Sequence, residues 1–229
     1  MNPQIEEGVT TAQRGNSIRA VQVQNIIARM EGSNSQQTML LMAHYDSVPY
    51  ARGAADDAAG VAAILEAVRA LQAGPPLQND VVILFTDAEE GGLMGARYFT
   101  ENNPLMEEID LVLNFEARGT SGSSIMFETN DGNDKLIPLF EEATPNPVAN
   151  SLTYSVYKVL PNDTDFTMFK QHDIQGLNYA FIEDYLDYHT MQDNPENLSL
   201  SSLQHHGENL LGNCGYLAIQ ILISLRNQM

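Results

Sequence analysis

The sequence predicts an α/β fold: a three-layer sandwich with a central mixed, mostly parallel sheet and helices on both faces. Three observations predict it. Segments with strand character alternate with segments of helical periodicity along the chain. Several strand segments are apolar throughout, as strands covered on both faces are. The 229 residues contain no repeat and no low-complexity linker, so we expect a single domain over residues 1–229.

The first half of the chain supplies strands on either side of one helix. Residues 19–32 are broadly strand-like, and residues 38–47 form an apolar run that ends in polar residues. A helix is predicted over residues 61–71, because its apolar side chains recur at helical spacing: Val61, Ile64, Leu65, Val68 and Leu71. The Gly-Pro-Pro at 74–76 ends that helix, and residues 80–87 form a buried type of strand.

The second half continues the alternation. Helices are predicted over 93–102 and 133–144, and strands over 109–119, 123–129, 152–159 and 174–182. A long amphipathic helix is predicted from Ser201, with one apolar stripe: Leu203, Leu210, Cys214, Leu217, Ile221 and Leu225. His205 and His206 fall at the start of this helix, where we expect them to be exposed, and His172 is expected in a turn.

Charge and composition exclude several classes of partner. The formal net charge is −19, from 30 acidic and 11 basic residues, and such a surface repels nucleic-acid phosphates and anionic lipids. No run of 18 apolar residues exists, so no membrane-spanning segment is predicted. The first 17 residues lack the basic and apolar regions of a signal peptide. Cys214 is the only cysteine, which excludes an internal disulfide.

Potential metal ligands stand at the ends of four apolar strands. In open α/β sheets the functional site lies beyond the carboxyl ends of the strands. The four ends carry, in chain order, His44 and Asp46; Asp87, Glu89 and Glu90; Glu116; and Asp187 and His189, while Asp56 and Asp57 follow in the loop after the first. One carboxylate after a strand is ordinarily a solvated turn residue. Four coincident ends with histidine or carboxylate therefore indicate a metal site.

The residue types favour zinc. Imidazole together with carboxylate suits zinc, whereas calcium and magnesium prefer oxygen ligands. Two histidines and several carboxylates are sufficient for two ions that share a bridging carboxylate. Successive side chains that leave a strand point in different directions, so Glu89 and Glu90 can divide two tasks. One would bind metal, and the other would act as a general base on a water molecule.

In their order along the chain these motifs resemble metallopeptidase family 28, the co-catalytic zinc aminopeptidases. The motifs are "HYDS", "GAADDAAGVAAILE", "TDAEEGGLMGARYF", "NFEARG" and "DYHTMQD", which lie between residues 40 and 198. Within that family the chain looks most like the luminal peptidase domain of the membrane-bound proteases of the endoplasmic reticulum and vacuole and their bacterial relatives. The resemblance implies a zinc exopeptidase-like fold, a peptide substrate and an extracytoplasmic location.

The resemblance also implies roles for individual residues. Metal ligands are implied at five positions, with Asp56 bridging two Zn²⁺ ions: His44, Asp56, Glu90, Glu116 and His189. Many relatives have aspartate at the position of Glu116. Glu89 is the implied general base, and Tyr188 an implied donor to the oxyanion. Supporting roles behind the ligands are implied for Asp46, Asp57 and Asp193, and substrate-binding roles are assigned to Arg118 and Asp165.

The function that these roles imply is a di-zinc aminopeptidase. We further expect the first side chain of the substrate to pack near residues 154–157 and 166–169. Three alternatives stay open. A carboxypeptidase would need cations for the terminal carboxylate, with Arg52, Arg97 and Arg118 near the motifs. A glutaminyl cyclase shares the fold and uses one zinc. An inactive binding module would have lost ligand residues, whereas here every ligand position is filled.

Overall fold

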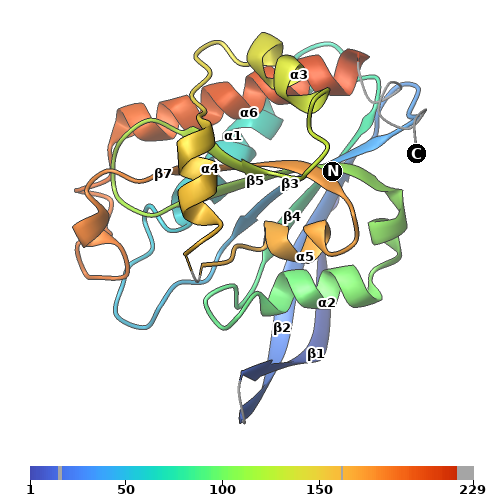
Figure 1. Ribbon diagram of the computed structural model, residues 1–229. Coiled ribbons are helices and arrows are strands. Elements are labelled where there is room, and N and C mark those ends of the chain that lie inside the picture. The colour runs from blue at the N-terminus through green and yellow to red at the C-terminus, as the bar shows by residue number, and fades with distance from the viewer. Residues whose placement is uncertain (15–16, 161, 221–229) are drawn as a thin grey trace.

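The computed structural model describes residues 1–14, 17–160 and 162–220, and it contains one seven-stranded mixed sheet (Figure 1). The strand order across the sheet is β1-β2-β4-β3-β5-β7-β6. β4, β3, β5 and β7 are parallel neighbours, whereas β1, β2 and β6 each join by antiparallel pairing. The strands are β1 (Gln4–Arg14), β2 (Ser17–Met30), β3 (Thr38–His44), β4 (Asp80–Thr86), β5 (Ile109–Ala117), β6 (Ile125–Thr129) and β7 (Gln175–Phe181).

Helices cover both faces of this sheet, which confirms the predicted three layers. Helices α1 (Ala58–Ala73), α3 (Leu136–Ala143) and α6 (Leu200–Gln220) pack on one face, and α2 (Met94–Asn102) and α5 (Phe166–Lys170) on the other (Figure 1). The other helical segments are α4 (Ser151–Tyr157), η1 (Pro104–Glu108) and η2 (Tyr185–Asp187). In the part of the chain described, no helix combines the length and apolar character needed to cross a bilayer.

Strands β3 and β4 are buried at every position because each face of the sheet has its own core. In β3, Met39 and Leu41 pack towards α1, α3 and α6, while Leu40 and Met42 pack towards α2 and α5. The alternation follows from the two-residue period of a strand. It explains why β3 and β4 are continuous apolar runs in the sequence, and why their polar residues stand at their ends.

Two N-terminal and peripheral elements differ from the prediction. Residues 152–159 were predicted as a strand, but residues 151–157 form helix α4. Its first turn is fixed by Asn150, whose side-chain oxygen accepts a hydrogen bond from the Thr153 backbone N–H at 2.7 Å. Strand β1 was not predicted, and β2 begins at Ser17, so the two form a long hairpin that extends beyond the rest of the sheet (Figure 1).

The C-terminal helix was predicted correctly from Ser201 onward, within one residue of its observed start. Leu210 and Cys214 of the predicted stripe are fully buried against the core. The side chain of Leu217, and residues Ile221 and Leu225, lie outside the described part of the chain.

Candidate metal centre

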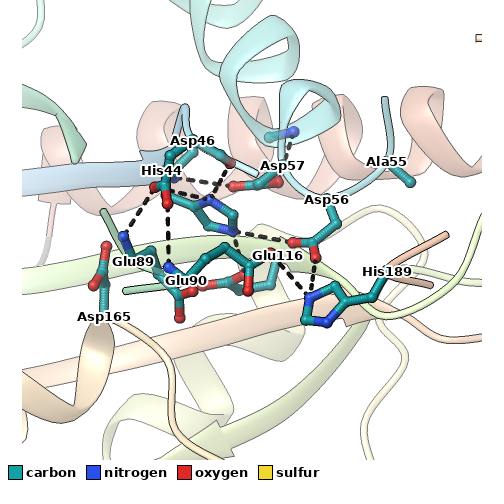
Figure 2. A network of polar contacts seen from close by, with 12 residues as sticks. His44, Asp46, Ala55, Asp56, Asp57, Glu89, Glu90, Glu116, Asp165 and His189 are labelled. Atoms are coloured by element: carbon teal, nitrogen blue, oxygen red, sulfur yellow. Dashed lines mark hydrogen bonds and ion pairs between the residues drawn. The ribbon is translucent and has the colours of Figure 1, made fainter. Parts of the chain in front are cut away.

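The predicted site residues converge at the carboxyl ends of β3, β4, β5 and β7 (Figure 2). His44 is the last residue of β3, Glu90 lies in the turn after β4, Glu116 lies one residue before the end of β5, and His189 follows η2. Among the residues described, two groups of side chains have ligand atoms close enough to hold a metal ion: His44, Asp57 and Glu116, and Asp56, Glu90 and His189.

The first group surrounds the ring of His44, which is 1% exposed. Its Nδ1 lies 2.9 Å from the backbone oxygen of Asp46 and donates there, which leaves the lone pair on Nε2. Nε2 faces Asp56 Oδ1 at 3.0 Å and Glu116 Oε2 at 3.5 Å. Burial lowers the pKa of His44, but nearby carboxylates outweigh that effect and raise it well above its usual value. The surrounding carboxylates therefore favour a positive charge here, either as a proton on Nε2 or as a metal ion bound to it.

The second group has three buried atoms without a hydrogen-bond partner in the described structure: Asp56 Oδ2, Glu90 Oε1 and His189 Nε2. His189 Nε2 nevertheless lies 2.9 Å from Glu90 Oε1 and 3.2 Å from Asp56 Oδ2. Buried polar atoms are almost always paired, so a cluster of unpaired ones calls for a missing partner. Two carboxylate oxygens and an imidazole nitrogen that converge in this way fit a cation such as zinc.

Asp56 belongs to the second group and also contacts the first, because its two oxygens face different histidines. Oδ1 faces His44 and Oδ2 faces His189 (Figure 2). Its carboxylate is 4% exposed, and its peptide bond to Asp57 is cis. Asp193 accepts hydrogen bonds from the backbone N–H groups of Ala55 at 2.6 Å and Asp56 at 3.2 Å. One residue from a distant loop thus fixes the position of the side chain that joins the two groups.

Asp57 has a different environment, although it is next in the chain. Its Oδ2 accepts from the His44 backbone N–H at 3.2 Å, and its Oδ1 accepts from Gly60 N–H at 3.1 Å and caps α1. Burial is the main cause that raises the pKa of Asp57 well above its usual value. Since both oxygens already accept backbone hydrogen bonds, Asp57 supports the loop beside His44.

The paired glutamates after β4 are held by Asp46. Its Oδ1 accepts from Glu89 N–H at 2.9 Å and its Oδ2 from Glu90 N–H at 3.2 Å. The resemblance implied a supporting role for Asp46 behind the ligands. The His44 ring nitrogen lies nearer to the Asp46 backbone oxygen, at 2.9 Å, than to the Asp46 carboxylate, at 3.6 Å. Burial raises the pKa of Glu89 well above that of an ordinary carboxyl group, so Glu89 is suited to receive a proton.

A cleft of about 1320 Å³ opens above these residues. Asp56, Glu89, Glu90, Glu116 and His189 all line it. One wall comes from the β1–β2 hairpin. Another comes from α4 and from the segment that follows it: Thr153, Val156, Tyr157 and Leu160. From the predicted segment 154–157, Val156 and Tyr157 border the cleft. From 166–169, Thr167 and Met168 do so, while Phe166 and Phe169 are fully buried in the core.

The two residues predicted to bind substrate have opposite exposure. Arg118 is exposed and lines the cleft, with its guanidinium carbon 5.3 Å from the centre of the Tyr188 ring. Asp165 is 1% exposed, and its Oδ2 accepts a hydrogen bond from the Thr86 hydroxyl. Burial raises the pKa of Asp165 to about 7. The structure therefore corrects the prediction for Asp165: it lies beside Glu89 (Figure 2), but it does not line the cleft.

The sequence analysis did not identify two polar residues that lie behind the metal centre, His206 and Asn114. His206 was predicted to be exposed, but it is fully buried: its Nε2 lies 3.0 Å from the Glu116 backbone oxygen and its Nδ1 2.6 Å from Ser124 Oγ. Its position four residues before Leu210 on the apolar stripe was the signal for burial. Asn114, inside β5, donates to Glu116 Oε1 and Asn178 Oδ1, both at 3.0 Å.

Two other carboxylates at strand ends remain outside the cluster. Asp87 accepts a hydrogen bond from the backbone N–H of Gln24 in β2 at 2.9 Å. Asp187 accepts one from the Thr120 hydroxyl at 2.7 Å. Both therefore stabilise loops around the site, and neither belongs to the two groups that could hold a metal ion.

Comparisons with known proteins identify the family and the fold. A family model described as Peptidase family M28 matches residues 25–213. The chain is 33% identical over 207 residues to endoplasmic reticulum metallopeptidase 1 of Rattus norvegicus, a match that covers 88% of this chain and 23% of that protein. It is 32% identical over 199 residues to the vacuolar membrane protease of Candida dubliniensis, covering 86% of this chain and 21% of that protein. The chain thus spans less than a quarter of the length of these two relatives.

Solved structures confirm the fold. A zinc aminopeptidase from Bacillus subtilis has a TM-score of 0.70 at 22% identity, with 89% of this chain and 52% of that chain covered. A glutaminyl cyclase from Porphyromonas gingivalis has a TM-score of 0.68 at 20% identity, with 94% and 83% covered. Because two different activities share the fold at this similarity, the fold alone does not decide between them.

Proposed function

The chain belongs to peptidase family M28, and from this premise we propose that it is a zinc-dependent aminopeptidase that releases N-terminal residues from peptides. The observation that carries the proposal is the junction at Asp56, whose oxygens face His44 at 3.0 Å and His189 at 3.2 Å. Histidine and carboxylate atoms meet on both sides of this junction, next to the half-buried Glu89 and under an open cleft. That arrangement suits hydrolysis assisted by metal.

Two zinc ions would be held by five side chains. His44 and Glu116 would bind one ion, Glu90 and His189 would bind the other, and Asp56 would bridge them. The unpaired buried atoms Asp56 Oδ2, Glu90 Oε1 and His189 Nε2 support the fit. The hydrogen bond from His44 Nδ1 to the Asp46 carbonyl supports it as well, because it leaves Nε2 free to act as the ligand.

The chemistry follows from the residues around the metal. Bound zinc supplies a Lewis acid that lowers the pKa of a water towards ~7 and polarises the scissile carbonyl. Glu89 takes the proton of the attacking water and delivers it to the leaving amine. Tyr188 donates its hydroxyl proton in a hydrogen bond to the oxygen that becomes negatively charged. Asp46 keeps Glu89 in position through its backbone N–H.

The floor of the cleft is acidic before metal binds, because four carboxylates line it: Asp56, Glu89, Glu90 and Glu116. Two bound zinc ions would offset their charge, so the charge of the floor does not by itself select one end of the substrate. The zinc aminopeptidase from Bacillus subtilis that shares this fold supports an aminopeptidase over a carboxypeptidase. Since relatives are named for the endoplasmic reticulum and the vacuolar membrane, we place the activity outside the cytoplasm.

The test is digestion of short peptides by zinc-loaded protein, with free or acetylated N-termini and products identified by mass spectrometry. We expect stepwise loss of N-terminal residues from the free peptides only. Glu89→Gln should abolish turnover while zinc content stays the same. The matched control is Glu141→Gln, a change of the same kind on the exposed side of α3, which should retain full activity.

Other products would favour the alternatives. Release of C-terminal residues would indicate a carboxypeptidase. Cyclised N-terminal glutamine without hydrolysis would indicate a glutaminyl cyclase, the activity named for one of the structural neighbours. Zinc binding without turnover of any substrate would indicate a binding module.

A further inference from the structure

Arg118 has an unusual charge environment. It follows the end of β5, its side chain is exposed, and it lines the cleft. Its backbone N–H donates to the Phe181 carbonyl at 2.9 Å, which fixes the main chain. The guanidinium lies over the Tyr188 ring at 5.3 Å, and within the described residues no carboxylate or carbonyl accepts from it. A contact with a ring face uses none of the five guanidinium N–H donors, so these remain free.

Four other arginines in the described structure have carboxylate partners. Arg29 pairs with Asp80 and Glu108; Arg52 pairs with Glu196, Arg69 with Glu66, and Arg97 with Glu101. Arg19 has only the Gly91 carbonyl as acceptor, at 2.8 Å. The chain has 30 acidic and 11 basic residues, so a partner for Arg118 would be easy to supply. Among the arginines whose side chains the structure describes, Arg19 and Arg118 are the two that lack a carboxylate partner, and both line the cleft.

The position of Arg118 relative to the metal centre limits what it can bind. Its guanidinium contacts Tyr188, and the Tyr188 ring stacks on the His189 ring with 3.7 Å between centroids. His189 Nε2 is 2.9 Å from Glu90. Arg118 therefore lies two ring contacts from the predicted ligands. In a dipeptide the terminal carboxylate follows the scissile carbonyl by one residue, a spacing of roughly 4 Å.

We propose that Arg118 binds the C-terminal carboxylate of dipeptides, so that the preferred substrates are dipeptides with a free carboxylate. This rests on the proposed peptidase function and adds the substrate class. The amino end lies over the acidic floor, the scissile carbonyl lies beside Tyr188, and the carboxylate meets the guanidinium. A guanidinium matches a carboxylate with two parallel hydrogen bonds, which a lysine ammonium does not reproduce.

The experiment compares kcat/KM for a dipeptide such as Leu-Ala and for its C-terminal amide. For the zinc-loaded protein we expect the free acid to be preferred by at least about tenfold, the loss typical of one charge-assisted contact. Arg118→Ala should remove that preference, mainly through KM of the free acid, and Arg118→Lys should restore only part of it. Arg52→Ala removes an exposed cation that is paired with Glu196 and lies outside the cleft, so it should keep the preference.

Each other result overturns the inference in a distinct way. Equal hydrolysis of acid and amide by the unchanged protein would leave an aminopeptidase without carboxylate recognition. An equal fall of kcat for both substrates in Arg118→Ala would mean that Arg118 only positions Tyr188. Loss of the preference in Arg19→Ala, but not in Arg118→Ala, would move the carboxylate to the hairpin side of the cleft. No turnover of either substrate would refute the proposed function itself.

Discussion

The carboxylate of Asp193 holds the backbone of Asp56 although 137 residues separate the two in the sequence. Its two oxygens accept from consecutive N–H groups, those of Ala55 and Asp56. Asp56 in turn faces both His44 and His189. The loop after η2, which carries His189 and Asp193, therefore sets the geometry of the loop after β3 as well as supplying a predicted ligand of its own.

Asp193→Asn should weaken zinc binding. An amide has one acceptor oxygen, so one of the two N–H groups at Ala55 and Asp56 loses its partner and faces an NH₂ group. We expect zinc affinity to fall about 10- to 100-fold, as for other residues that orient ligands, and the unfolding free energy to fall by about 1–3 kcal/mol. A zinc titration with a competing chelator and a urea denaturation curve measure both quantities.

Asp134→Asn, the same change at an exposed residue before α3, is the matched control. It should leave both quantities as they are in the unchanged protein. Zinc affinity of Asp193→Asn equal to that of the control would contradict a role of Asp193 in holding Asp56.

Asp46→Asn should slow turnover more than it weakens folding. The side chain accepts from both Glu89 N–H and Glu90 N–H, and asparagine can serve only one of them. Because Glu89 is the proposed base, a small displacement should lower kcat by about tenfold or more. The measurement is kcat at saturating peptide together with zinc content, and an unchanged kcat would show that the turn holds its position without Asp46.

Removal of zinc should destabilise the protein. Without a cation, carboxylate oxygens and imidazole nitrogens stand about 3 Å apart in buried positions, and the native state alone presents this cluster. At free zinc a hundredfold above its dissociation constant, the stabilisation is about 2.7 kcal/mol. The melting temperature should therefore rise with zinc and fall with a chelator.

His189→Ala should reduce this zinc-dependent rise, whereas His172→Ala should not. His172 is exposed in a turn after α5, as the sequence predicted, so it reports any effect of zinc on a surface histidine. A melting temperature that is independent of zinc in the unchanged protein would speak against a metal centre at this edge of the sheet.

The parts of the fold that the sequence predicted are those with the strongest burial constraints. Strands β3, β4, β5 and β7 are covered on both faces, so their segments contain many apolar residues, most continuously in β3 and β4, and the polar residues at their ends stand out. The residues at those ends could then be found, because parallel strands bring their carboxyl ends to one edge. The same constraint explains why α1, with its buried side against the sheet, was recognised from its periodicity.

The missed features have weaker or conflicting local signals. In α4 no residue is buried, and its alternating apolar residues resemble a strand, but Thr153, Val156, Tyr157 and Leu160 all line the cleft at helical spacing. Strand β1 pairs only with β2 and carries exposed Ile5 and Val9. Strand β1 forms because it pairs with β2 in a hairpin, and such pairing cannot be predicted from the composition of one segment.

Acidification should destabilise the protein partly through His206. Burial is the main cause that lowers the pKa of His206 to about 4, from 6.5. Between pH 6.5 and 4 the unfolded chain therefore binds a proton that the folded chain does not, so unfolding becomes easier as the pH falls. The full contribution is present above pH 6.5, and about 3 kcal/mol is lost on the way down through pH 4.

The measurement is the unfolding free energy between pH 7.5 and 4 in the presence of a chelator, for the unchanged protein and for His206→Gln. The variant has no group that titrates at this position, so its unfolding free energy should fall less steeply with acid, even if it is lower at pH 7.5. His172→Gln removes an exposed histidine and should keep the slope of the unchanged protein. Parallel slopes for all three proteins would mean that His206 is reached by solvent and protonated in the folded state. The hydrogen bond to the Glu116 backbone oxygen, at 3.0 Å, would then come from a charged imidazolium and not from a buried neutral imidazole.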